Sequence, residues 1–91
     1  MALYMIVEHF KNNDAAPIYR RFRERGRMNL EGLRYISSYI DEDFTRCYQL
    51  METSDHALLD DWIAKWSDLV DFEVYPVITS AEAVERIAPR L

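Results

Sequence analysis

The stretch Arg46–Thr53 (RCYQLMET) is the feature that most constrains how this chain can fold. It is rich in strand-favouring side chains, contains no Gly or Pro, and lies near the middle of the chain. The acidic residues 41–43 precede it as a tight turn, and residues 53–55 (TSD) follow it as a helix-start signal. We therefore predict a central β-strand here, around which the other elements are arranged.

Three further stretches predict strands that can join the central one. Residues 2–10 (ALYMIVEHF) form a mostly apolar run typical of a buried strand, and residues 32–40 (GLRYISSYI) alternate in polarity. The acidic turn would join the second of these to the central strand as a hairpin. Residues 71–78 (DFEVYPVI) predict a fourth strand, which Pro76 places at a sheet edge because proline cannot donate a backbone hydrogen bond.

Periodicity and capping signals predict three helices. The first follows a cap at Asn13 or Asp14 and runs to about Arg25, with Pro17 in its first turn. The second opens at Asp55, with Ser54 as an alternative cap. Its apolar positions follow the helical period: Leu58, Leu59, Trp62, Ile63, Trp66 and Leu69. A short last helix has its cap at Thr79 or Ser80 and reaches about residue 87.

The resulting order, β-α-β-β-α-β plus a terminal helix, predicts an α+β ferredoxin-like fold. Right-handed crossovers give the strand order 4-1-3-2, with all neighbours antiparallel. Both main helices then cover one face of the sheet and leave the other bare. We predict one domain over residues 1–91. Because 49% of the residues are hydrophobic, we expect the bare face to meet a second copy, giving a homodimer.

Composition narrows the class of protein. A net charge of −5 argues against nucleic-acid binding. No apolar run approaches the roughly 20 residues that span a bilayer, and no signal peptide is recognisable, so we expect no membrane role and a cytoplasmic location. One cysteine suits a reducing compartment. The spacing of Cys and His is not that of a metal site, and no phosphate-binding glycine loop is present, so no metal or cofactor is expected.

Alternation along the strands suggests where chemistry could occur. We predict that five charged and aromatic side chains share the bare face, because a helix-covered face rarely tolerates many charges: Glu8, Arg46, Tyr48, Glu73 and Tyr75. Glu8, Arg46 and Glu73 would gather at one end of the sheet. They could form a structural ion-pair network, or one carboxylate could acquire a raised pKa and act as a general base.

Other candidates have two interpretations each. His9 and Cys47 are predicted at the same end of the helix-covered face, either as a nucleophile with its base or as a buried thiol near a loop histidine. Trp62 and Trp66 could form an aromatic wall for a ligand or the ordinary core stripe of a helix. Five arginines between residues 20 and 27 could bind an anion or simply face water at a helix end. The candidate ligand-binding residues are Tyr4, His9, Tyr48, Trp62, Trp66 and Tyr75.

Several short strings resemble those of one family of short bacterial proteins known only as a domain of unknown function. The strings are residues 8–10 (EHF), 23–28 (RERGRM), 46–52 (RCYQLME), 62–66 (WIAKW) and 71–77 (DFEVYPV). That family is similar to the dimeric α/β-barrel group, in which two ferredoxin-like sheets pack face to face and often enclose a cavity. The group includes cofactor-free monooxygenases, haem-handling proteins, decarboxylases and isomerases. The resemblance implies a fold and a dimer but no reaction, and a haem ligated by His9 has no other support.

Three functions follow as hypotheses. The first is a small dimeric protein that binds an apolar or aromatic small molecule, either between sheet and helices or between two sheets. The second is a cofactor-free enzyme of monooxygenase, decarboxylase or isomerase type, with Glu8 or Glu73 as base and Arg46 holding an anionic group. The third is an assembly module without catalysis. A closed polar pocket near Glu8 would favour the enzyme, and a filled dry interface would favour the module.

Overall fold

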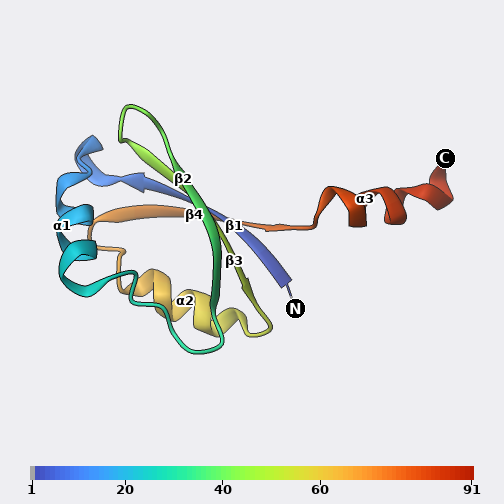
Figure 1. Cartoon of the computed structure of the whole chain (residues 1–91), viewed down its shortest axis with the longest axis horizontal. Coiled ribbons are helices and arrows are strands. Elements are labelled where there is room, and N and C mark those ends of the chain that lie inside the picture. The colour runs from blue at the N-terminus through green and yellow to red at the C-terminus, as the bar shows by residue number, and fades with distance from the viewer. Residues whose placement is uncertain (1) are drawn as a thin grey trace.

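A computed structural model describes residues 2–91 of the chain (Figure 1). Its elements are β1 (Ala2–Phe10), α1 (Ala16–Arg25), β2 (Arg34–Ile40), β3 (Arg46–Thr53), α2 (His56–Ala64), β4 (Val70–Val77) and α3 (Ser80–Ile87). Short 3-10 turns, Lys11–Asn13 and Ala88–Arg90, follow β1 and α3. The strands form one antiparallel sheet in the order β2-β3-β1-β4. The predicted α+β ferredoxin-like fold and its strand order are confirmed.

Most element boundaries agree with the predictions. β1 and β3 cover the predicted residues, and β4 is an edge strand that contains Pro76, as expected. β2 begins two residues later than predicted, because Gly32 lies in a turn with a φ of +89°. α1 ends where expected, at Gly26, whose φ of +68° is readily adopted by glycine and whose N–H bonds to the carbonyl of Phe22.

α2 is shorter than the periodic stripe suggested. It begins after Asp55, whose carboxylate accepts a hydrogen bond from the Ala57 N–H at 3.0 Å, and it ends at Ala64. Residues 65–69 continue as turns, in which the N–H of Leu69 bonds to the carbonyl of Trp66. Such turns preserve the spacing of the apolar side chains, and Trp66 is still buried. The prediction that the helix extends to Leu69 is therefore wrong, although its apolar stripe still packs on the sheet.

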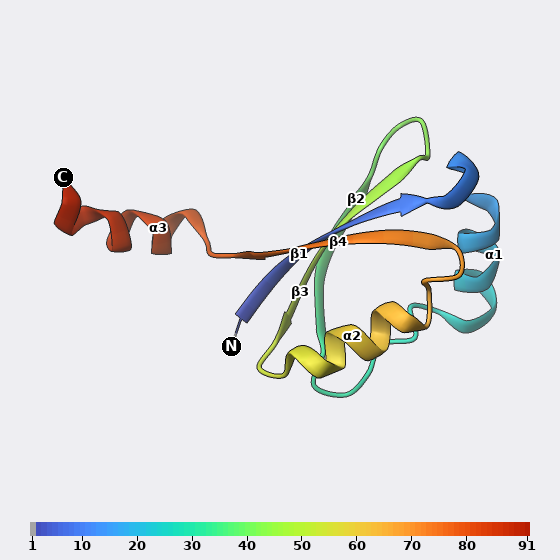
Figure 2. The same cartoon turned by 180° about the vertical axis from the view of Figure 1, so that it is seen from behind.

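Both α1 and α2 lie on one face of the sheet, and the core forms between these helices and the sheet (Figures 1 and 2). The buried apolar side chains are Ile6, Phe10, Ile18, Leu33, Met51, Leu59, Trp62, Trp66 and Val70. In the part of the chain that the structure describes, no helix covers the opposite face, which we call the open face. Residues 2–91 contain no helix long and apolar enough to span a membrane.

Candidate ligand pocket

The face on which Glu8 lies was predicted wrongly, and this changes the location of the candidate site. Directly opposed residues of antiparallel strands point to the same side of a sheet. Glu8 is opposite Cys47 on β3 and Phe72 on β4, so it lies on the helix-covered face. Arg46 and Glu73 lie on the open face, and the predicted cluster of the three does not form. The reason is that Ile6 and Phe10 must be buried, and Glu8 lies between them in the alternation.

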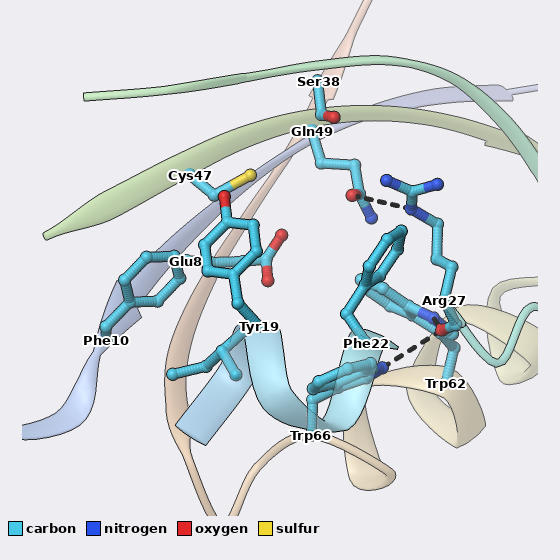
Figure 3. A pocket seen from close by; sticks show the side chains of 11 residues that line it. Glu8, Phe10, Tyr19, Phe22, Arg27, Ser38, Cys47, Gln49, Trp62 and Trp66 are labelled. Atoms are coloured by element: carbon cyan, nitrogen blue, oxygen red, sulfur yellow. Dashed lines mark hydrogen bonds between the residues drawn. The ribbon is translucent and has the colours of Figure 1, made fainter. Parts of the chain in front are cut away.

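A pocket of about 190 Å³ opens between the sheet, α1 and α2 around Glu8 (Figure 3). Its aromatic and aliphatic lining consists of Phe10, Ile18, Tyr19, Phe22, Trp62 and Trp66. Its polar lining consists of Glu8, Arg27, Ser38, Cys47 and Gln49. The walls are thus mainly aromatic, with a few polar groups directed inward, which is the composition typical of small-molecule sites.

Glu8 is the most unusual side chain in this pocket. It is only 7% exposed, and within residues 2–91 no basic group lies within salt-bridge distance of it. Burial raises the pKa of its carboxyl from 4.5 to about 7, and the Cys47 thiol and the positive charge of Arg27 offset only part of that rise. Figure 3 shows the carboxylate pointing into the pocket beside Tyr19 and Cys47. Glu8 can therefore exchange a proton near neutral pH.

Cys47 is the neighbour of Glu8 and not of His9, contrary to prediction. His9 is opposite Arg46 and Asp71 and lies on the open face, so the proposed pairing of Cys47 with His9 does not exist. Burial and the negative charge of Glu8 raise the pKa of the Cys47 thiol to about 12. Such a thiol is protonated at neutral pH and is a poor nucleophile. Cys47 therefore contributes a small, weakly polar surface to the pocket wall.

Arg27 closes the pocket, and it is firmly held. Its guanidinium lies over the ring of Tyr35 at 3.7 Å and near that of Phe22 at 5.3 Å, and its Nε donates to the Gln49 side-chain oxygen at 3.3 Å. The indole N–H groups of Trp62 and Trp66 both donate to its backbone carbonyl, at 3.0 and 3.2 Å. The loop after α1 is thereby anchored to α2 and to the turn that follows it, which brings a positive charge to the pocket.

The two tryptophans belong to the core and also form part of the pocket wall. Trp62 and Trp66 are 2% and 4% exposed and belong to the core, and both also line the pocket. Tyr4, predicted as a ligand-binding residue, does not line it. It packs edge-on against the ring of His56, with ring centroids 5.3 Å apart.

The other predicted site residues lie on the open face. Glu73 accepts hydrogen bonds from the Tyr75 hydroxyl at 2.5 Å and from His9 Nε2 at 3.1 Å, and the first of these is the main cause of its lowered pKa. Arg46 instead forms a salt bridge with Asp41 at 2.9 Å and lies 5.9 Å from the ring centre of Tyr48. These exposed pairs lie on the face opposite Glu8 and do not line its pocket. The charged site predicted around Arg46 and Glu73 therefore stays a prediction without geometric support.

The five arginines between residues 20 and 27 differ in what they contact. Arg21 forms a bidentate salt bridge with Asp68, at 2.8 and 2.6 Å, and so ties α1 to the turn before β4. Arg27 enters the pocket as described. Arg20, Arg23 and Arg25 are exposed. Within residues 2–91, no group of three or more His, Cys, Asp or Glu side chains is arranged to hold a metal ion.

The pocket residues that the sequence did not predict as part of a small-molecule site were Phe10, Ile18, Tyr19, Phe22, Arg27, Ser38 and Gln49. A usable signal exists for four of them. Gln49 alternates with Cys47 and Met51 on β3, which puts these three side chains on the same face of the sheet. The helical period puts Ile18, Tyr19 and Phe22 on one face of the first helix. The contribution of Arg27 depends on the path of the loop after α1, which no local pattern specifies.

The fold and pocket define a small α+β protein of ferredoxin-like architecture with a single-ring-sized cavity beneath its helices. The chain belongs to the DUF3303 family, a domain of unknown function, whose model matches residues 2–91. Its fold is similar to that of protein Atu4242 from Agrobacterium tumefaciens, a crystal structure from a structural genomics consortium, with a TM-score of 0.53 and 17% identity over 86% of this chain and 93% of that one. No curated protein matches the chain significantly.

Proposed function

We propose that this protein binds a small, neutral, single-ring aromatic molecule in the pocket around Glu8. The observation that carries the proposal is a buried carboxyl without a salt-bridge partner, pointing into a space with aromatic walls. A volume of about 190 Å³ suits one ring, since an engineered cavity of about 150 Å³ binds benzene. A ligand hydroxyl or amine could donate a hydrogen bond to Glu8, which would give specificity to an otherwise apolar contact.

The chain contains a direct reporter of binding, because its two tryptophans both line the pocket. Titration with p-cresol, followed by NMR of the two indole N–H signals, should shift both signals to saturation. Toluene should bind more weakly, and Glu8→Leu should remove the preference for p-cresol over toluene. Tyr48→Phe, on the open face, is the matched control and should leave the titration unchanged. Indole signals that do not move at millimolar p-cresol would overturn the proposal.

The enzyme alternative is favoured by one observation, the buried carboxyl of Glu8 that points into the pocket without a salt-bridge partner. Burial raises its pKa to about 7, close to the ideal value for a general acid or base at neutral pH. In this form of the proposal, Glu8 removes a proton from carbon in a cyclic ketone or a similar substrate, without a cofactor. Hydrogen–deuterium exchange at the α-carbon of cyclohexanone in D₂O should then be faster with the wild type than with Glu8→Gln. Equal exchange rates would leave binding as the function.

We also propose that the protein is a cytoplasmic homodimer that associates through the open face. Leu3, Met5 and Val7 of β1 form an apolar row there, which Leu50 and Val77 extend on the neighbouring strands. These side chains are only half-buried, with no helix over them in the described residues. Light scattering at micromolar concentration should give twice the chain mass of 10.9 kDa, and Met5→Glu should reduce it. A wild-type monomer would contradict the dimer and favour a different partner.

A further inference from the structure

The C-terminal helix α3 extends away from the rest of the molecule. It begins at Ser80, after a two-residue link from Val77 at the end of β4, and projects from the body in both views (Figures 1 and 2). Its main contact is with the turn Ala88–Arg90 that follows it, and none of its residues is buried. We call residues 80–91 the C-terminal arm.

The arm has one apolar side with nothing from the described chain packed on it. Val84 is 67% exposed and Leu91 94%, and Ile87 between them is also exposed. A spacing of three residues puts Val84 and Ile87 on the same side of α3, and Leu91 follows the turn Ala88–Arg90 beyond the end of the helix. The helix begins at Thr79, whose hydroxyl accepts a hydrogen bond from the Glu82 N–H at 3.1 Å. The Glu82 side chain pairs with Arg86 at 2.6 Å and so turns away from the Thr79 N–H that it would accept from in a capping box.

Such a helix needs a packing partner to be stable. An isolated helix shorter than about 12 residues is marginal in water, and the arm's cap and its one ion pair add little. Its sequence nevertheless shows a clear cap and a regular apolar stripe over eight helical residues. Both features indicate that the arm packs its apolar side against another surface. The rest of its own chain, over the described residues, does not provide that surface.

The surface area points to a second copy as the partner. The chain exposes 6180 Å², about 600 Å² more than expected for a folded monomer of 10.9 kDa. Its radius of gyration, 14.9 Å, exceeds the roughly 12 Å expected for this length. A standard interface covers about 800 Å² on each partner, so the excess is of the size that one such contact removes.

Charge and shape agree with this choice. The arm contains two acidic and two basic residues and is neutral, whereas the whole chain carries −5, so the arm can approach a second acidic body without net repulsion. A groove of about 650 Å³ lies where the arm leaves the sheet, lined by Leu3, Glu52, Val77, Ile78 and Arg86 among others. It adjoins the apolar row of the open face at Leu3 and Val77, so the two surfaces are continuous.

We infer that the C-terminal arm is exchanged between two copies of this chain, with the side of α3 formed by Val84 and Ile87 packed on the partner. A two-fold axis satisfies both arms at once, because each copy gives and receives the same contact. The inference rests on the proposed homodimer and extends it, since the open face alone would leave both arms in solvent.

The test is sedimentation velocity of the full chain over a range of micromolar concentrations. The double variant Val84→Glu, Ile87→Glu should weaken the dimer by about 100-fold or more, because it places charges in a contact that must be dry. Glu85→Gln, on the polar side of the same helix, is the matched control and should leave the dissociation constant unchanged. Unshifted indole N–H signals would show that the variants keep the body folded.

The outcomes separate the two proposals. A wild-type dimer that the double variant leaves intact, but that Met5→Glu dissociates, overturns the arm exchange and keeps the open-face dimer. A dimer that both variants weaken supports both. A wild-type monomer overturns the dimer and the exchange together, and protection of α3 from amide exchange in that monomer would show that the arm folds back on its own chain.

Discussion

At the scale of single residues, the location of the pocket depends on the face of the sheet that Glu8 occupies. Its strand has apolar side chains on both sides, Ile6 and Phe10 on one and Met5 and Val7 on the other. Alternation therefore shows which residues share a face but not which face is covered. The register of β1 with β3 decides this, by placing Glu8 opposite Cys47. The consequence is a carboxyl with a pKa of about 7 in place of a surface ion pair.

The raised pKa of Glu8 predicts a pH dependence of stability. A carboxyl whose pKa is 4.5 when unfolded and about 7 when folded binds its proton more tightly in the folded state. The stability from this group is full below about pH 4.5 and is lost as pH rises to about 7, a total of about 3 kcal/mol. Urea unfolding of wild type and Glu8→Gln between about pH 5 and about pH 8 should show the mutant gaining relative stability with pH. Parallel curves would contradict the burial of an ionisable carboxyl.

The same site predicts an unreactive thiol. With a pKa of about 12, Cys47 has about a thousandfold less thiolate near neutral pH than a cysteine with the ordinary value of 9.0. Modification by Ellman's reagent should be far slower in the folded protein than in urea. Glu8→Gln should speed the folded-state reaction at slightly alkaline pH, because it removes the neighbouring negative charge. A wild-type rate equal to that of the unfolded chain would place Cys47 at the surface.

At the scale of elements, the strands, the helices and their order could be predicted because hydrophobic period and turn chemistry are local. The end of α2 could not, because turns with i to i−3 hydrogen bonds keep nearly the same apolar spacing as a helix. Part of the pocket lining could not be predicted from the sequence either. Arg27 reaches it through a loop whose carbonyl is held by Trp62 and Trp66, and that is a tertiary contact.

Trp66 links the turn after α2 to the loop after α1, so its loss should be costly. Trp66→Ala should destabilise the protein by about 3–5 kcal/mol, by truncating a side chain that is almost fully buried. Tyr39→Ala is a suitable control, because Tyr39 is an exposed aromatic residue on β2 and should cost about 0.5 kcal/mol or less. The midpoint of urea unfolding measures both. Similar shifts for the two variants would mean that Trp66 does not carry core packing.

At the scale of the whole molecule, the chain measures 48 × 30 × 17 Å, and its longest dimension includes the projecting arm (Figure 1). Its sheet has one face covered by helices and one face open. Its covered side holds the pocket, and its open side and arm hold the surfaces proposed for association. The proposed binding and assembly would thus use opposite sides of the sheet. The two central strands contribute to both surfaces: β1 presents Glu8 to the pocket and Leu3, Met5 and Val7 to the open face, and β3 presents Cys47 and Gln49 to the pocket and Leu50 to the open face.

Association predicts that stability depends on concentration. If two copies fold together, the thermal midpoint of the wild type should rise with protein concentration, because mass action favours the dimer. The double variant Val84→Glu, Ile87→Glu should show a weaker dependence, since its dimer dissociates more readily. Calorimetry over a range of concentrations gives both slopes. A wild-type midpoint independent of concentration would argue against coupling between folding and assembly.

The most direct test of the pocket is the titration of Glu8 itself. Carbon-13 NMR of the side-chain carboxyl, assigned by comparison with Glu8→Gln, reports its protonation without any assumption about the ligand. A carboxyl buried in the pocket should titrate with a midpoint near 7, which moves when p-cresol occupies the pocket. A midpoint near the ordinary 4.5, unchanged by p-cresol, would mean that the carboxyl is solvated, and the pocket would then have no claim to be the functional site.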